Sequence, residues 1–275
     1  MSFAPAAPSE PDPLTALLTW YVEMGVLDTT GAAIGSSESE AEVRRSEWPS
    51  ASPPIASPAP VPLAAASASA PALTDSQRLA REAQSLEALR QEIERFEGCA
   101  LKQTATHTVF ADGNPAADLL FIGEAPGREE DLRGLPFVGH SGQLLDRMLA
   151  AIGRDRQSAY IINILPWRPP ANRSPTPEEM AVCLPFVLRH IELARPRVLV
   201  ALGGVAAKQL LDTQAGIMRL RGQWQHVTLP NGTELPLLPT FHPAYLLRQP
   251  AHKQLAWRDF VALKHKLHDL STASS

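Results

Sequence analysis

"LLFIGEAPG", residues 119–127, decides the fold. An apolar run ends in a glycine, and a carboxylate, an alanine, a proline and a second glycine follow it. A short apolar run bounded by turn residues is typical of a strand that is buried on both faces. Small residues directly after such a strand let the backbone approach a neighbouring group closely. The stretch therefore predicts a buried strand whose carboxyl end forms one wall of a site.

Three more apolar runs resemble this strand, and helical patterns separate them. A capping box formed by Thr176 and Glu179, with Pro177 at the first helical position, marks one helix start, and Ser141 is the expected N-cap of another. Alternation of strands and helices predicts an α/β fold, a three-layer α/β/α sandwich around a central, mainly parallel four-stranded sheet. The expected strands are 117–123, 159–165, 197–203 and 235–242.

The chain divides into three parts. Residues 49–73 contain mainly proline, alanine and serine and no charge, which predicts a disordered linker. We expect residues 1–48 to form an N-terminal segment with a short helix at 13–27, which either docks an unknown protein or packs back on the domain. Residues 74–275 form the α/β domain, which begins with helical spacing of apolar residues from Leu79 to Phe96.

Composition narrows the class of protein. No apolar run is long enough to span a membrane, and the N-terminus lacks the basic flank and apolar stretch that are typical of a secretory signal. Two cysteines do not form a disulfide framework, so we expect a cytoplasmic protein. Residues 1–98 carry 14 acidic and 6 basic side chains, whereas residues 99–275 carry 15 acidic and 19 basic ones. The mildly basic second part is compatible with a polyanionic partner.

Chemically useful side chains follow the predicted strands. Ligands bind beyond the carboxyl ends of the strands in a parallel sheet, so residues that follow different strands are expected to meet there. Each of them also has an ordinary structural interpretation, as a turn, a cap or a core residue. The candidates that share this edge are Gly123, Glu124, Ala125, Phe137, Asn163 and His242. No phosphate-binding lysine motif or dinucleotide fingerprint accompanies them.

Four segments together resemble a known family. "GEAPGREEDLRGLPFVGHSGQLL", "YIINILPWRPPANRSPTPEEMAVC", "LVALGGVAA" and "TFHPAYLLR" are similar to the iron–sulfur-type uracil-DNA glycosylases, often called family 4. The resemblance runs from about residue 96 to about residue 265. It implies a uracil-DNA glycosylase-like domain at 74–275 and hydrolysis of the N-glycosidic bond of deoxyuridine in DNA, as a monofunctional enzyme of base-excision repair. Uracil-containing DNA is the implied partner, and we expect a monomer.

The resemblance also assigns roles. Uracil would bind against Gly123, Glu124 and Ala125, stack on Phe137 and pair with Asn163. His242 matches the catalytic histidine. Ala125 stands where better-known uracil glycosylases place an aspartate that handles water, so Glu124 is the first candidate for that task. A stretch that would enter the DNA minor groove contains Leu246 and Leu247, with Arg248 on a phosphate.

The chain departs from the family at the cluster. The family holds a four-iron cluster with four cysteines, and the corresponding residues here are Phe96, Cys99, Trp167 and Cys183. Phenyl and indole rings do not bind iron, so we expect no cluster and no other metal or cofactor. We expect the two rings to fill the vacated volume as a hydrophobic plug, in contact with each other and flanking the cysteines.

Two alternatives to the enzyme remain open. One is a non-catalytic or weakly active protein that binds uracil-containing or damaged DNA. The other is a glycosylase for another deaminated base, such as hypoxanthine. The joint presence of Phe137, Asn163 and His242 favours the uracil-releasing enzyme.

Overall fold

The sheet lies at the centre of the domain. The computed structural model describes residues 70–272 of the chain. Its single six-stranded sheet has the order β1-β3-β2-β4-β6-β5. β2, β3, β4 and β6 pair in parallel, and β1 and β5 pair antiparallel with β3 and β6 at the two edges. The strands are β1 (Asp112–Gly113), β2 (Leu119–Gly123), β3 (Tyr160–Asn163), β4 (Val198–Leu202), β5 (Gln225–Thr228) and β6 (Glu234–Thr240).

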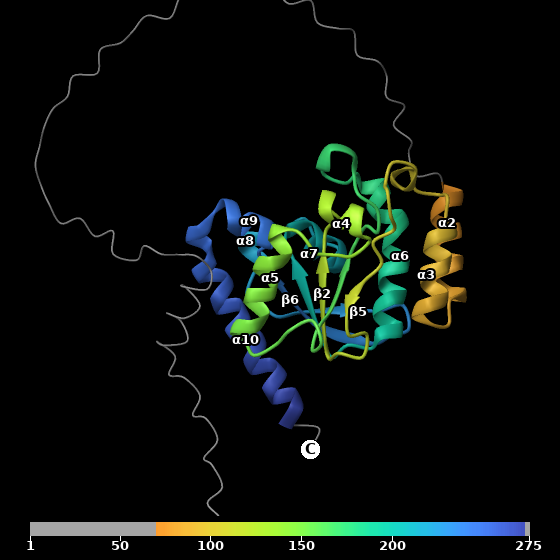
Figure 1. Cartoon of the computed structure of the whole chain (residues 1–275). Coiled ribbons are helices and arrows are strands. Elements are labelled where there is room, and N and C mark those ends of the chain that lie inside the picture. Colours follow the sequence, from red (N-terminus) through yellow and green to blue (C-terminus); the bar gives the residue numbers. More distant parts are fainter. Residues whose placement is uncertain (1–69, 273–275) are drawn as a thin grey trace, which may run out of the picture.

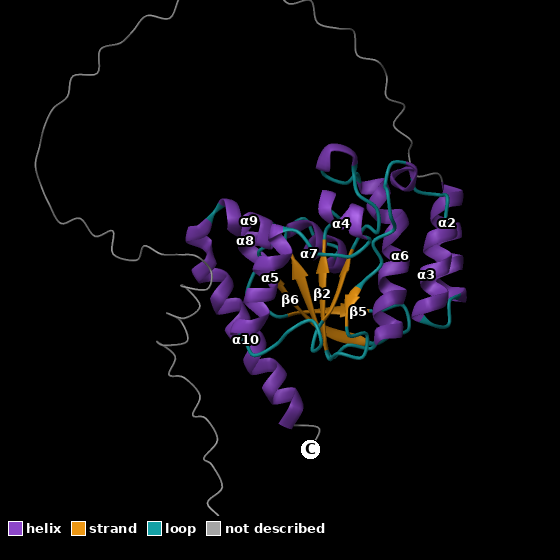
Figure 2. Cartoon of the chain, viewed as in Figure 1, coloured by secondary structure: helices purple, strands orange, loops and turns teal. Residues whose placement is uncertain are grey.

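Helices cover both faces of this sheet and complete the predicted α/β/α sandwich, as Figures 1 and 2 show. The α-helices are α2 (Ala70–Glu82), α3 (Leu86–Arg95), α4 (Arg128–Arg133), α5 (His140–Ala151), α6 (Pro177–Ala194), α7 (Gly204–Leu211), α8 (Ile217–Leu220), α9 (Pro243–Arg248) and α10 (Lys253–Thr272). Three short 3-10 helices are η1 (Ala100–Gln103), η2 (Pro170–Asn172) and η3 (Pro250–His252).

Alternation along the strands builds two cores. In β2, Leu120 and Ile122 belong to the core on the side of α2, α3, α6 and α7. Leu119 and Phe121 belong to the core on the opposite side, with α5, α9 and α10. Successive side chains of a strand point to opposite faces, so a strand that is apolar at every position requires helices on both. All five residues of β2 are buried, which confirms the interpretation of the opening stretch.

The structure differs from the sequence-based expectation in several local features. Two short edge strands, β1 and β5, join the four expected ones. The apolar pattern from Leu79 to Phe96 is divided between α2 and α3, because Ser85 caps a new helix start by accepting from the N–H of Ala88. α2 begins at Ala70, so residues 70–73 are helical and were wrongly assigned to the linker.

One expected cap is also wrong, and another is confirmed. Gly139, not Ser141, is the N-cap of α5. The capping box of α6 is present as expected: Thr176 accepts from the N–H of Glu179, whose carboxylate accepts from the N–H of Thr176. The N-terminal segment 1–48 and most of the linker lie outside the described residues. No helix within residues 70–272 is long and apolar enough to cross a membrane.

Candidate active site

A cavity of about 370 Å³ opens at the carboxyl ends of the parallel strands. Its volume is within the range of roughly 300–1,000 Å³ that is usual for small-molecule pockets. Six of the residues singled out from the sequence line it: Glu124, Ala125, Phe137, Asn163, His242 and Arg248. Parallel pairing explains this convergence, because β2, β3 and β6 all end at the same edge of the sheet. The side chains of residues 137, 163 and 242 therefore share one cavity.

Gly123 supports this cavity from behind. It pairs with Asn163 in the register of β2 and β3. A Cβ atom at Gly123 would lie 2.3 Å from Oδ1 of Asn163 and 2.7 Å from the ring of Phe137. Contacts that short are not tolerated, so only glycine lets the amide and the ring lie side by side here. The space left by this glycine is occupied by two protein side chains, and Gly123 itself is not among the residues that line the cavity.

Asn163 lines the cavity and carries a buried acceptor that has no partner within the described part of the chain. The residue is 7% exposed, and its Oδ1 has no hydrogen-bond partner among the described residues. An unpaired buried polar atom costs about 1–3 kcal/mol, so such atoms are uncommon unless a ligand completes them. A donor N–H of a ligand that reached this oxygen would relieve the cost.

Phe137 and His242 form a second wall. Their ring centroids are 5.4 Å apart, with the ring planes inclined by 30°. Phe137 is 4% exposed and has a positive φ of 53°, an unusual backbone conformation for a residue with a side chain. A flat aromatic surface beside an unpaired amide oxygen is suited to a planar heterocycle with an N–H on its edge.

His242 has a fixed orientation and a fixed tautomer. It is the N-cap of α9, and its Nδ1 accepts a hydrogen bond of 3.1 Å from the backbone N–H of Ala244. Because that N–H can only donate, Nδ1 carries no proton, and the proton of the neutral ring is on Nε2. Burial, aided by the charge of Arg248, lowers the pKa of His242 to about 4, against a smaller opposing effect of Glu130. The ring is therefore neutral at pH 7 and offers Nε2–H as a donor.

Glu124 lies between two cavities. A second cavity of about 300 Å³ shares Glu124, His242 and Tyr245 with the first and extends towards Gly203 and Lys208. Burial raises the pKa of the Glu124 carboxyl. A carboxylate in this setting is a stronger base than one in water, which is useful for orienting or deprotonating a water molecule.

The stretch that the sequence assigned to the DNA groove divides into buried and exposed residues. Leu246 is 0% exposed and belongs to the core on the α5 and α10 side, so the expectation that it enters the groove is wrong for this conformation. Leu247 is 40% exposed, and Arg248 is exposed at the edge of the cavity. In a six-residue helix such as α9, adjacent positions point in different directions, which separates Leu246 from Leu247.

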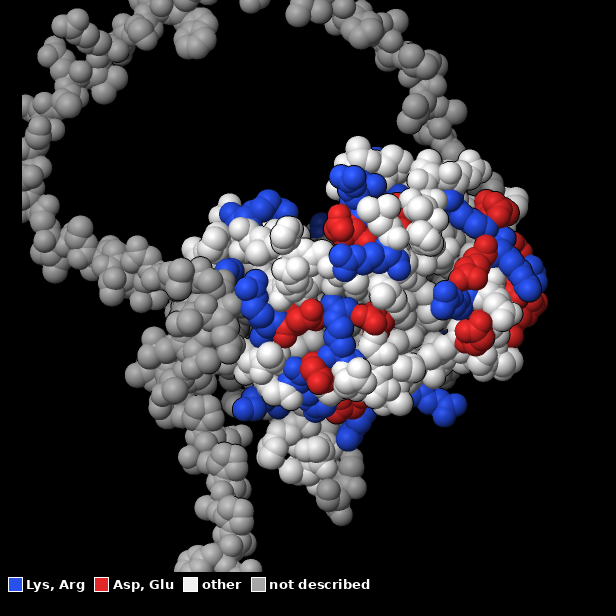
Figure 3. Space-filling model, in the orientation of Figure 1, with Lys and Arg blue, Asp and Glu red and all other residues white. Residues whose placement is uncertain are grey.

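Positive and negative side chains are interspersed on the face shown in Figure 3.

Comparison with known proteins identifies the family. The family model described as "Uracil DNA glycosylase superfamily" matches residues 110–261. The chain belongs to the uracil-DNA glycosylase superfamily. It is 41% identical over 181 residues to the type-4 uracil-DNA glycosylase of Archaeoglobus fulgidus, covering 64% of this chain and 90% of that protein. It is 39% identical over 169 residues to the type-4 uracil-DNA glycosylase of Thermotoga maritima, covering 61% of this chain and 86% of that protein.

A third relative agrees with these two. The type-4 uracil-DNA glycosylase of Sulfurisphaera tokodaii is 35% identical over 185 residues, which cover 66% of this chain and 84% of that protein. The residues matched by the superfamily model, 110–261, include β2, β3, β4 and β6. The resemblance found in the motifs is thereby confirmed.

The side chains at the cluster positions of this uracil-DNA glycosylase domain do not fit a four-cysteine metal cluster. Phe96, Cys99, Trp167 and Cys183 are all buried in the core on the α3 and α6 side. A hydrogen bond between the two thiols lowers the pKa of Cys99 and raises that of Cys183. Within residues 70–272, no group of three or more histidine, cysteine or acidic side chains is placed to hold a metal ion. Two sulfur donors and two carbon rings leave half of the required ligands missing.

The two aromatic replacements have definite partners. The ring of Phe96 packs edge-on against Phe186, with centroids 5.2 Å apart. The indole N–H of Trp167 donates to Oγ1 of Thr108 at 3.0 Å. The hydrogen bond of Trp167 anchors the loop after β3, which contributes Asn172 and Arg173 to the cavity. Direct contact between Phe96 and Trp167 stays a prediction.

Glu130 is a site residue of this superfamily member that sequence reasoning missed. It is 8% exposed and lines the cavity. Its carboxylate accepts hydrogen bonds from the N–H groups of Gly127, Val138 and Gly139, at 3.1, 2.9 and 2.9 Å. It therefore joins the start of α4 to the segment that follows Phe137. The sequence could have indicated this role, because Glu130 is the third residue of a helix, and an acidic residue at that position often accepts hydrogen bonds from backbone N–H groups.

Proposed function

We propose that this protein is a monofunctional uracil-DNA glycosylase, which hydrolyses the N-glycosidic bond of deoxyuridine in DNA and leaves an abasic site for base-excision repair. The observation that supports this best is the cavity that Asn163, Phe137 and His242 line together, with Oδ1 of Asn163 buried and unpaired within residues 70–272. The type-4 relatives carry the same activity in their names.

Recognition begins with a base outside the helix. A base within a duplex does not reach a cavity of this kind, so the nucleotide has to flip out. Uracil would stack on Phe137, a contact of about 1–3 kcal/mol for a base on an aromatic ring. Oδ1 of Asn163 would accept from N3–H of uracil, and its amide N–H would donate to O4. Cytosine presents the reverse pattern and would leave buried groups unpaired, at about 1–3 kcal/mol for each group.

His242 is placed to act on the departing base. Breaking the C–N bond leaves negative charge on uracil and positive charge on the sugar. A neutral imidazole that donates from Nε2 stabilises the charge that gathers on O2 of the base. Its orientation is fixed before the reaction by Ala244, so little reorganisation is needed in the transition state. Loss of the proton from Nε2 is not required.

Glu124 is our candidate for the group that handles water. Its carboxylate borders both cavities, and its raised pKa is suited to general-base assistance. The attacking water would then approach the sugar from the side of the second cavity. Ala125 leaves space beside Glu124 where an aspartate would otherwise compete for that water.

Contact with the rest of the DNA is assigned to α9. Leu247, exposed at 40%, would enter the groove beside the flipped nucleotide, and Arg248 would meet a phosphate.

We further propose that the enzyme works without an iron–sulfur cluster, as a monomer in the cytoplasm. Both cysteines are free thiols, which suits a reducing compartment. The packing of Phe96 against Phe186 and the hydrogen bond from Trp167 to Thr108 supply the local anchoring that a cluster would otherwise give.

Release of free uracil from a labelled oligonucleotide tests this function. The wild-type chain is incubated with oligonucleotides that carry uracil, hypoxanthine or thymine at one position, in single- and double-stranded form. We expect release from the uracil substrate alone and a strong reduction in the Asn163→Ala variant. Tight binding to the uracil oligonucleotide with no release would support a non-catalytic binding protein instead. Preferential release of hypoxanthine would change the assigned substrate.

A further inference from the structure

Phe137 is held in a strained position. Its backbone φ of 53° is in the left-handed region, which costs a residue with a side chain about 1–2 kcal/mol. The ring is nevertheless fixed against Gly123 and His242, where the base is expected to stack. A strained residue at a site persists only when surrounding contacts determine its position. Those contacts should therefore be found on the peptide groups next to Phe137.

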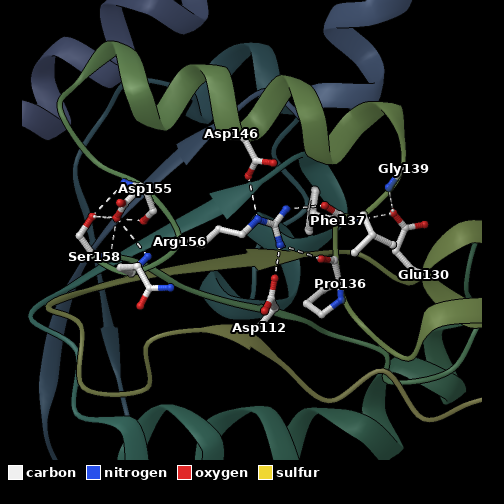
Figure 4. Close-up of polar contacts among 11 residues, drawn as sticks. Asp112, Glu130, Pro136, Phe137, Gly139, Asp146, Asp155, Arg156 and Ser158 are labelled. Atoms are coloured by element: carbon white, nitrogen blue, oxygen red, sulfur yellow. Dashed lines mark hydrogen bonds and ion pairs between the residues drawn. The ribbon is translucent and has the colours of Figure 1, made fainter.

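Arg156 makes those contacts from outside the cavity. It lies between α5 and β3, and its guanidinium donates to the carbonyl oxygens of both Pro136 and Phe137. The same group donates to Asp146 of α5 at 2.8 Å and to Asp112 of β1. Figure 4 shows Arg156 between these two carboxylates and facing the two carbonyls. One guanidinium group thus binds the side chain of α5, the side chain of β1 and the two carbonyls next to Phe137 at the same time.

The opposite side of the same segment is also fixed. Glu130 accepts from the N–H groups of Val138 and Gly139, directly after Phe137. α5 approaches the Phe137 carbonyl so closely that a Cβ atom at Gly142 would lie 1.7 Å from that oxygen. α5 therefore closes one side of this carbonyl, and Arg156 donates to it from another. Between them, these groups hold the peptide groups on both sides of Phe137.

We propose that Arg156 is a positioning residue for base recognition: it acts through the carbonyls of Pro136 and Phe137 to hold the Phe137 ring in the plane where a flipped base stacks. Arg156 is not among the residues that line the cavity, so it does not touch the base itself. The proposal rests on the proposed function, because it gives the stacking surface of that site its support.

The substitution Arg156→Lys tests it. Lysine keeps the positive charge beside Asp112 and Asp146, but a single ammonium group does not reproduce the fork that also reaches both carbonyls. We expect the single-turnover rate of uracil release to fall roughly ten- to hundredfold, as expected for a displaced recognition group. Binding to DNA without uracil should stay unchanged. The side chain of Arg156 is mostly buried, at 23% exposed, and does not line the cavity.

Arg154→Lys is the matched control. Arg154 lies two residues away, is similarly exposed at 28%, and pairs with Asp118 at 3.4 Å, with no bond to the Phe137 segment. A partly exposed pair of this length contributes little, so we expect release rates within about twofold of wild type. Thermal unfolding of both variants is measured beside the rates.

A double-mutant cycle separates positioning from general stability. If Arg156 acts through the ring, Arg156→Lys should add little to the loss already caused by Phe137→Ala. An equal loss in both backgrounds, or a rate for Arg156→Lys within twofold of wild type, would overturn the proposal. If Arg156→Lys does not fold, Asp146→Asn replaces it, because Asp146 is 47% exposed and holds the Nε end of the same guanidinium.

The failure of this inference differs from a failure of the proposed function. If the wild-type chain releases uracil and Arg156→Lys releases it at the same rate, only the positioning role is contradicted. A wild-type chain that releases no uracil contradicts the enzymatic function. In that event the double-mutant cycle is measured by binding instead of release. The quantity is the ratio of the affinities for a uracil-containing and a thymine-containing oligonucleotide. An unchanged ratio in Arg156→Lys overturns the positioning role.

Discussion

The backbone N–H of Ala244 donates to Nδ1 of His242, and this one bond sets which nitrogen of the ring carries the proton. The histidine is both the cap of α9 and a wall of the cavity, so the start of the helix orients the ring that lines the cavity. Removal of the imidazole should therefore affect the chemical step more than substrate binding.

The first prediction concerns that step. His242→Ala should reduce the single-turnover rate of uracil release by about 10²–10³-fold, the usual effect of removing one preorganised donor. Affinity for uracil-containing DNA should change far less. His226→Ala is the control, because His226 is exposed on the edge strand β5, and it should match wild type. A His242→Ala rate close to wild type would remove His242 from the mechanism.

The second prediction concerns pH. Burial lowers the pKa of His190 to about 3, and burial with Arg248 lowers that of His242 to about 4. An unfolded chain has histidines with pKa values near 6.5, so below that pH it binds more protons than the folded chain. The contribution of these two histidines to the free energy of unfolding is therefore fully present above pH 6.5. It is lost as the pH falls towards 4, by about 1.4 kcal/mol for each unit of pKa difference.

Urea unfolding at pH 7 and pH 5 measures this loss. The difference in the free energy of unfolding between the two pH values should be smaller in His190→Gln, which removes one of the two groups, and unchanged in His226→Ala.

Within the pH range where the protein stays folded, the rate of uracil release should not fall on the acid side near pH 6.5. A fall at that pH would mean that His242 titrates as an exposed histidine does.

The third prediction separates two neighbouring leucines. Leu246→Ala should lower the free energy of unfolding by about 2–5 kcal/mol, because it creates a cavity in a fully buried position. Leu247→Ala should change stability by less than about 0.5 kcal/mol, since the side chain is exposed. Activity on double-stranded DNA should nevertheless fall more in Leu247→Ala than activity on single strands. Equal losses on the two substrates would argue against a role for Leu247 in the groove.

The fourth prediction concerns metal. Protein purified without added iron should contain well under one iron atom per chain and should lack a brown colour. Replacing Phe96 and Trp167 together by cysteine would restore the four-cysteine set of the family. After anaerobic reconstitution the double variant should bind iron and sulfide, whereas wild type treated in parallel should not. Stoichiometric iron in the wild-type protein would contradict the cluster-free proposal.

The sequence predicted the elements that have a continuous apolar pattern. The four parallel strands were found because each contains at least four consecutive buried residues. The edge strands escaped detection for physical reasons: β1 has two residues, and β5 buries only Val227. The break between α2 and α3 was missed because apolar residues continue across it at helical spacing.

At the site, the sequence predicted which residues meet but not what holds them. Asn163 and His242 follow strands whose ends must converge, so their meeting follows from topology. The contacts of Arg156 with Pro136 and Phe137 are made to backbone carbonyls 19 and 20 residues away, and no sequence pattern records such a bond. The burial of Leu246 likewise depends on the rotation of α9 against the core, which six residues do not reveal.

The pairing of Gly123 with Asn163 across β2 and β3 has a consequence for how such enzymes diversify. The spacing between these two residues is set by the backbone ladder, so insertions or deletions in the surrounding loops leave it unchanged. The loop that carries Arg173 and the turn after Leu247 can therefore vary in length and charge while the selected base stays the same. Under the proposed function, in which Asn163 reads the base and Leu247 enters the groove, the choice of base and the choice of DNA form would depend on different residues and could evolve separately.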